Sequence, residues 1–161
     1  MFRFLNYIQN GENDGFNKNK GRNVGNTNRH AFNCGGYALG TFSWYCPYTE
    51  EEDGENGFGW GWDSYEEVVE VTEHCTEQML KDFSDLRVIN SLSELNKTEY
   101  AIAFRVSSDG DFHYVKRGFN GQWYHKRGSC PSIETMTARE VFRTAWCLKY
   151  NGPIVLFAKQ K

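Results

Sequence analysis

The sequence has no long apolar run. Nowhere do its 161 residues approach the roughly 18 consecutive apolar residues of a membrane-spanning helix, so we expect no membrane segment. The first ten residues, MFRFLNYIQN, also lack the continuous apolar core and the small-residue cleavage site of a secretion signal. We therefore expect a soluble, cytoplasmic protein, with delivery into another cell or a viral origin left open.

Cysteine is too sparse and too widely spaced for a disulfide scaffold. The number of cysteines is odd, no CxxC motif occurs, and the five residues are Cys34, Cys46, Cys75, Cys130 and Cys147. This pattern favours a reducing compartment, with no cofactor and no metal. A zinc site built from Cys34, His113 and His125 is the less favoured alternative, because no fourth ligand is evident.

The chain also lacks a strong charge excess, internal repeats and a long linker. Its 18 basic and 21 acidic residues give a net charge of −3, so we expect no nucleic-acid partner. With 39% hydrophobic and 16% aromatic residues, it has enough apolar surface for one domain over residues 1–161. Residues 10–30 are an irregular, Asn- and Gly-rich lead-in, and the acidic run 50–55 is expected to be a solvated loop.

Helical signals precede strand signals along the chain. Asn33 is expected to cap a helix over 34–45, and Asp63 or Ser64 a second helix with Glu66 and Glu67 in its first turn. The apolar stripe of that second helix comprises Val68, Val69, Thr72, Cys75, Met79 and Leu80. Strands are expected over 86–89, 100–106, 111–117, 122–127 and 153–158, with a helical turn over 91–96 and a short helix over 137–144. This order predicts an α+β fold with N-terminal helices packed on a central antiparallel sheet.

The strands 111–117 and 122–127 are expected to form a hairpin. If residues 118–120 form a three-residue loop, Arg117 pairs with Gly121, and Asn120 or Gly121 takes the left-handed conformation. His113 then lies directly opposite His125, on the same face of the sheet. A slip of one residue would put the two imidazoles on opposite faces.

A cysteine at a helix start and two histidines on neighbouring strands are what thiol catalysis needs. His113 would take the proton of Cys34, and the thiolate would attack a carbonyl carbon. His125 would orient His113, with Asp111 as the alternative orienting group or simply a turn residue. The catalytic interpretation competes with a simpler one in which Cys34 and the histidines are core residues.

The segments Asn33-Cys34-Gly35-Gly36, His113-Tyr114-Val115 and Gly121-Gln122-Trp123-Tyr124-His125 resemble the NlpC/P60-like branch of the papain-like cysteine peptidases and amidases. The resemblance covers roughly residues 30–127 and implies Cys34 as nucleophile, His113 as base and His125 as the orienting residue of a catalytic triad. Asn33 stands where that family usually has aspartate, and Gly36 departs from its Cys-Ser-Gly pattern. The family implies a peptide, peptidoglycan-peptide or protein substrate.

The expected substrate contacts come from two loops. Asn33 and Gly35 flank the cysteine, and glycine allows close approach of a substrate. Trp60 and Trp62 lie in a glycine–aromatic loop that either walls a groove or fills the core. The basic pairs 116–117 and 126–127 are expected to be solvated strand ends. An acyltransferase or deamidase acting on proteins, and an inactive binding domain, are the alternative functions; the oligomeric state is left open.

Overall fold

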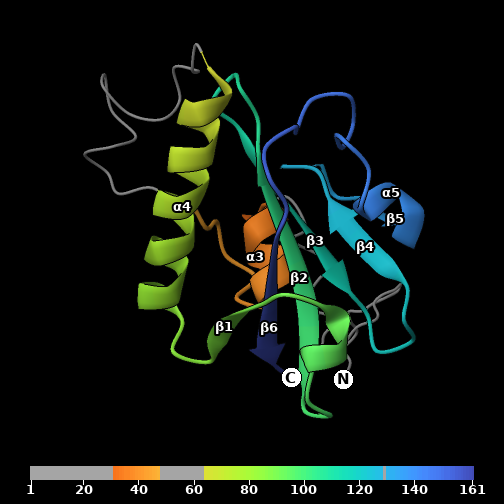
Figure 1. Cartoon of the computed structure of the whole chain (residues 1–161). Coiled ribbons are helices and arrows are strands. Elements are labelled where there is room, and N and C mark those ends of the chain that lie inside the picture. Colours follow the sequence, from red (N-terminus) through yellow and green to blue (C-terminus); the bar gives the residue numbers. More distant parts are fainter. Residues whose placement is uncertain (1–30, 48–63, 129) are drawn as a thin grey trace. The chain divides into compact units, whose positions relative to one another are not determined.

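The computed structural model describes residues 31–47, 64–128 and 130–161 (Figure 1). The chain divides into two compact units, one of Met1–Tyr45 and Val115–Thr137, the other of Cys46–Tyr114 and Ala138–Lys161. We call these the first and the second unit. The expected lead-in 10–30, the acidic run 50–55 and the loop carrying Trp60 and Trp62 lie outside the described residues.

The fold is α+β, as expected, with an antiparallel six-stranded sheet. The strand order is β1-β6-β2-β3-β4-β5. The strands are β1 Leu86–Ile89, β2 Glu99–Val106, β3 Phe112–Arg117, β4 Trp123–Lys126, β5 Ile133–Met136 and β6 Val155–Gln160. Five of them occupy the expected segments, whereas β5 was not anticipated. The strands do not form a simple meander, because the C-terminal β6 pairs with both β1 and β2.

The first unit is built around α3, Cys34–Leu39, which packs against β4. Asn33 caps this helix as expected, but the helix ends six residues earlier than the sequence suggested. Gly40 takes the left-handed conformation at φ 77°, and its N–H turns back to the carbonyl groups of the last helical turn. Phe42 also has a positive φ of 53°, so the chain cannot continue as a helix to Tyr45.

The second unit is built around α4, Tyr65–Asp82, which packs against β1 and β2 (Figure 1). Ser64 caps α4 by accepting a hydrogen bond from the Glu67 N–H, one of the two caps expected. The buried residues of the helix are Val68, Val71, Thr72, Cys75 and Met79. The expected stripe is therefore wrong at its edges: Val71 replaces Val69, which is half-buried, and Leu80 is exposed.

Short helical segments complete the second unit. A 3₁₀ turn, η3, spans Leu92–Glu94, and α5 spans Ala138–Val141. Both fall inside the segments where helical turns were expected. None of the helices in the described parts of the chain is both long and apolar enough to cross a membrane.

The hairpin between β3 and β4 has a different register from the one expected. Arg117 pairs with Trp123, not with Gly121, and Lys116 pairs with Tyr124. The Gly118 N–H donates to the Gln122 carbonyl at 2.7 Å, so the loop consists of residues 119–121. Gly121 takes the left-handed conformation at φ 87°, which moves the turn one residue along the chain.

Each residue of β3 therefore pairs with a residue two positions further along the chain than expected. On the observed register, continuing the pairing along β3 sets Val115 opposite His125. The expected direct opposition of His113 and His125 is wrong. The shift by two keeps the alternation of side chains along the strand, so it does not move His125 to the other face of β4.

Candidate active site

Cys34 is the first residue of α3, and Asn33 holds the chain in place around it. The Asn33 Oδ1 accepts hydrogen bonds from the backbone N–H groups of Gly36 at 3.0 Å and Tyr45 at 3.1 Å. Its Nδ2 donates to the Tyr45 carbonyl at 2.7 Å. The Asn33 side chain is thus both the helix cap and a tie across the loop that follows α3. The Cys34 side chain is buried, with 4% of its surface exposed.

The two glycines after Cys34 lie inside α3 and are buried. A Cβ atom at Gly36 would lie only 1.8 Å from the backbone carbonyl oxygen of Ser43 and 3.1 Å from Cβ of Phe32. Gly36 is therefore required by the close approach of the chain's own backbone after the helix. This is a structural reason for a glycine at position 36.

A buried lysine fixes the segment before Cys34. The Lys126 Nζ on β4 donates to the carbonyl groups of Phe32 and Gly128, and its ammonium group lies 4.9 Å from the centroid of the Phe32 ring. Lys116 on β3 is also buried, with its Nζ 4.9 Å from the centroid of the Tyr37 ring. The expectation that these lysines are solvated strand ends is wrong, because both pack on aromatic rings of the first unit.

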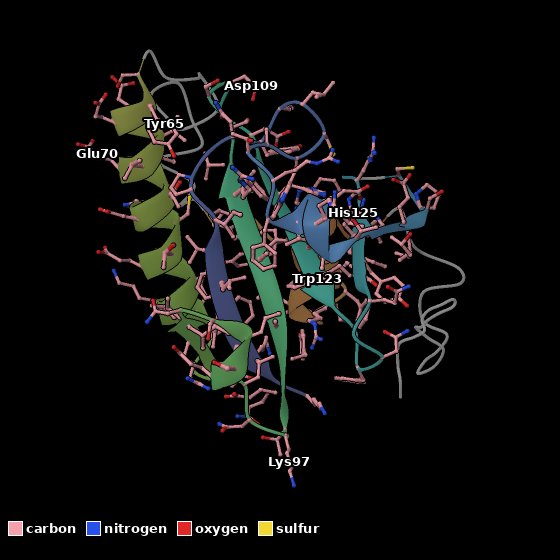
Figure 2. The ribbon with its side chains drawn as sticks, turned by 45° about the vertical axis from the view of Figure 1, so that its right-hand side comes forward. Tyr65, Glu70, Lys97, Asp109, Trp123 and His125 are labelled. Carbon is pink, nitrogen blue, oxygen red and sulfur yellow. The ribbon has the colours of Figure 1, made fainter. Side chains whose placement is uncertain are left out.

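His125 is buried on β4, in the same strand as Trp123 (Figure 2). Burial and, to a smaller extent, the positive charge of Arg127 together lower the pKa of His125 to about 4. Removing an imidazolium from water is unfavourable, so the side chain is neutral near pH 7. A neutral imidazole has one N–H donor and one nitrogen that accepts a hydrogen bond.

Glu134 on β5 is the cross-strand partner of His125. The His125 Nε2 lies 3.7 Å from the Glu134 Oε1, beyond hydrogen-bond distance, and the neutral imidazole makes this contact something other than an ion pair. The Arg127 Nε lies 3.2 Å from the same carboxylate oxygen. The carboxylate therefore pairs with Arg127 and lies close to the imidazole without a hydrogen bond to it.

His113 belongs to β3 in the second unit and is buried. Its ring stacks on Tyr150, with centroids 5.1 Å apart and planes at 21°, and meets the Trp146 ring edge-on at 6.2 Å. The Tyr150 hydroxyl donates to the Asp111 Oδ2 at 2.9 Å, and the Lys149 Nζ donates to the same oxygen at 2.8 Å. Asp111 thus orients the tyrosine that covers one face of the imidazole.

Asp111 also closes a turn, which was one of the two roles expected for it. Its N–H donates to the Ser107 Oγ at 3.1 Å, and its carbonyl accepts the Ser107 N–H at 2.8 Å. These bonds close the turn between β2 and β3, where Gly110 has a φ of 91°.

The segment that covers His113 is held by a buried arginine. The Arg105 guanidinium donates to the carbonyl groups of Gly152 at 2.7 Å, Arg143 at 2.8 Å and Thr144 at 2.5 Å. The guanidinium carbon of Arg105, Cζ, also lies 5.4 Å from the centroid of the Trp146 ring. One side chain from β2 therefore positions the loop that presents the aromatic partners of His113.

The expected site residues are distributed over both units. Asn33, Cys34, Gly35 and His125 are in the first unit, and His113 is in the second. Sequence reasoning missed Glu134, Tyr150 and Lys126. Hydropathy indicated that Lys126 is exposed to solvent, and Glu134 lies on β5, the strand that was not expected. The described residues contain no group of three or more His, Cys, Asp or Glu side chains arranged to hold a metal ion.

Comparison of the chain with protein-family models, with curated proteins and with solved structures gives no match.

Proposed function

We propose that this chain is a cysteine-dependent hydrolase of an amide or peptide bond, related in mechanism to the NlpC/P60-like peptidases. Cys34 is the nucleophile, His113 the base and His125 the orienting residue. The reaction passes through an acyl-enzyme, which water then hydrolyses. The proposal includes no metal and no cofactor.

One observation carries the proposal. Cys34 begins a helix that packs against β4, and β4 holds a buried histidine that is neutral near pH 7. A capped helix start and a strand histidine are also the elements that the resemblance requires, in the required chain order. Asn33 and Lys126 fix the backbone on both sides of the thiol, which suits a nucleophile whose position must be constant.

The neutral state of the His125 imidazole supports the division of roles between the two histidines. An imidazole with a pKa of about 4 is a poor acceptor for the proton of a thiol whose ordinary pKa is about 8.5. The same neutral ring accepts a hydrogen bond well, which is the function of an orienting residue. His113 is therefore the base of the proposal, and stacking on Tyr150 limits the rotation of its ring.

The proposed substrate is a peptide, a peptidoglycan peptide or a protein. Asn33 and Gly35 stand beside the nucleophile, and Trp60 and Trp62 are the proposed apolar contacts. Acyl transfer to water cleaves the chain, whereas transfer to another amine or removal of ammonia from an amide modifies it. The same nucleophile serves all three reactions, so the acceptor decides between them.

Selective alkylation of Cys34 tests the nucleophile. Cys75 is the matched control, because it is another buried cysteine, with 0% exposed surface, in α4. We expect iodoacetamide to label Cys34 faster than Cys75 between pH 5 and 8, as followed by peptide mass spectrometry. Equal labelling of the two, or Cys34 labelling that titrates near the ordinary thiol pKa of about 8.5, would refute an activated thiol.

Product analysis tests the reaction. Wild-type protein and Cys34→Ala are incubated with peptidoglycan peptides and with a defined protein mixture. New termini formed only by the wild type support hydrolysis, and a changed mass on an unbroken chain supports acyl transfer or deamidation. If neither protein changes any substrate, and iodoacetamide labels Cys34 no faster than Cys75, the chain is an inactive binding domain.

A further inference from the structure

The second unit carries an apolar groove beside a row of acidic side chains. The groove lies between α4 and the strands β1 and β6, and its volume is about 430 Å³. Volumes of this size hold one or two large side chains or a small ligand. It is lined by Val69, Thr72, Glu73, Thr76, Glu77, Val88, Pro153 and Val155.

The floor of the groove is apolar and accessible. Val88 on β1 has 44% of its surface exposed, although it lies in a strand whose neighbours Leu86 and Ile89 belong to the core. Val69 and Val155 are half-buried. β1 is the first strand in the sheet order, at one edge of the sheet, so no further strand of the described residues pairs with its outer side. Apolar side chains gathered at a sheet edge are typical of a binding surface.

The hydroxyl groups in the groove have their partners inside α4. The Thr72 Oγ1 donates to the Val68 carbonyl and the Thr76 Oγ1 donates to the Thr72 carbonyl, both at 2.7 Å. Both hydroxyl groups are therefore already hydrogen-bonded within the helix. The polar groups left to recognise a ligand are therefore the carboxylates of Glu73 and Glu77.

The acidic row comprises Glu66, Glu70, Glu73 and Glu77, all exposed. At about 100° per residue, these four positions fall within roughly 60° of one another around the helix axis. Glu73 and Glu77 form the rim of the groove, whereas Glu70 points away from the strands of the unit (Figure 2). Lys81 lies one turn beyond Glu77 and is the basic residue of the last turn of α4.

We propose that this groove binds a peptide segment in which apolar side chains alternate with lysine or arginine. The apolar side chains would cover Val69, Val88 and Val155, and the cationic groups would pair with Glu73 and Glu77. The carboxylates at the rim reject an acidic peptide, and the apolar floor gives no hydrogen bonds to a purely polar one. The surface does not depend on the proposed chemistry of Cys34.

Binding of short synthetic peptides tests the proposal. The probe is labelled Lys-Leu-Lys-Val-Lys-Leu-Lys, and its binding to the full chain is followed by fluorescence anisotropy. Two control peptides replace either every apolar residue by serine or every lysine by glutamate. Cys34→Ala is used throughout, so that cleavage of a probe cannot be mistaken for weak binding. We expect the first peptide to bind at least tenfold more tightly than either control.

Two double variants separate the groove from general electrostatic attraction. Glu73→Lys/Glu77→Lys reverses the charges at the rim, and Glu66→Lys/Glu70→Lys makes the same change in net charge away from the lining. We expect the rim variant to weaken binding at least tenfold and the other variant less than threefold. Three outcomes would each overturn the proposal. The two double variants could weaken binding equally, the serine peptide could bind as tightly as the probe, or the probe could fail to bind the chain whose four glutamates are unaltered.

Val88→Ser tests the apolar floor without changing charge. We expect it to weaken binding of the apolar probe several-fold and to leave the weak binding of the serine peptide unchanged. Circular dichroism and thermal unfolding check that each variant is folded. If Val88→Ser binds the probe as tightly as the parent chain, the peptide does not occupy the groove.

Discussion

Tyr150 stacks on His113 at a centroid distance of 5.1 Å and donates its hydroxyl to the Asp111 carboxylate. The tyrosine therefore links a strand residue that we propose as a base to the turn that begins the same strand. Its ring and its hydroxyl contribute separately, so two substitutions can distinguish them.

Tyr150→Phe is expected to remove the hydrogen bond and keep the stack. The loss of one hydrogen bond to a charged acceptor lowers the free energy of unfolding by about 1.5–3 kcal/mol. Tyr150→Leu removes the stack as well, which adds about 0.5–1.5 kcal/mol. Chemical denaturation measures both. Under the proposed function, Tyr150→Leu reduces turnover more than Tyr150→Phe; equal turnover in the two would show that the stack does not orient His113.

The neutral state of His125 makes stability depend on pH. Its pKa is about 4 in the folded protein and about 6.5 in the unfolded chain, so the unfolded chain binds the proton more tightly. The resulting stabilisation is fully present above pH 6.5 and is lost as the pH falls toward 4. The difference of about 2.5 units corresponds to about 3 kcal/mol.

Denaturation of His125→Gln over the same pH range checks this effect. We expect the slope of stability against pH between 4 and 6.5 to be shallower than in the wild type. Arg127→Gln is the companion variant, since it removes a charge that lowers the pKa and leaves burial unchanged. A His125 pKa near 6.5 by NMR titration would contradict both the buried neutral state and its role as an acceptor.

Lys126 is expected to control the backbone that precedes Cys34. Lys126→Met leaves the carbonyl groups of Phe32 and Gly128 without this donor, which lowers the free energy of unfolding by about 1–3 kcal/mol. Hydrogen exchange at residues 32–40 should become faster. Lys116→Met is the matched control, because it removes a cation–π contact with Tyr37 worth about 0.5–2 kcal/mol. Equal exchange in both variants would show that the Lys126 ammonium does not hold this segment.

Local chemistry in the sequence predicted helix starts and the position of the hairpin well. Asn33 and Ser64 are caps because a side-chain oxygen can satisfy an N–H two or three residues later, and that requirement is visible in the sequence. The hairpin loop was misplaced by one residue. A three-residue loop could begin at Gly118 or at Phe119, and only the observed strand pairing places it over residues 119–121.

The features that the sequence did not predict depend on contacts between distant segments. β5 has four residues without clear alternation, and it exists as a strand through its pairing with β4. Pairing of β6 with β1 and β2 joins residues 51 to 73 positions apart, which local patterns do not encode. Glu134 was missed as a neighbour of His125 for the same reason. Lys126 was expected to be solvated because a charged residue at a strand end usually faces water.

Gly36→Ala is expected to disturb α3 strongly. Its Cβ would meet the Ser43 carbonyl oxygen at 1.8 Å, and backbone atoms on both sides would have to move. Gly128→Ala is the matched control, since its Cβ meets nothing within 4 Å and the φ of 47° alone adds about 1 kcal/mol. We expect a clearly larger drop in melting temperature for Gly36→Ala. A smaller drop than in Gly128→Ala would show that the loop after α3 moves away at little cost.

Arg87 and Glu99 form a bidentate ion pair between β1 and β2, at 2.8 and 3.1 Å. The hydrogen bonds from Arg87 and from the Asn96 N–H lower the pKa of Glu99 to about 2. A carboxyl group with a lowered pKa stabilises the fold above its unfolded value of about 4.5, and that contribution is lost as the pH falls toward 2.

Arg87→Met is therefore expected to destabilise the protein at pH 7 and to matter less at pH 2. Denaturation of the wild type, Arg87→Met, Glu99→Gln and the double variant at both pH values gives the coupling between the two side chains. Because protonation of Glu99 removes the ion pair, the coupling should be present at pH 7 and smaller at pH 2. A coupling that is equal at the two pH values would mean that the pair acts through packing of the arginine stem, not through its charge.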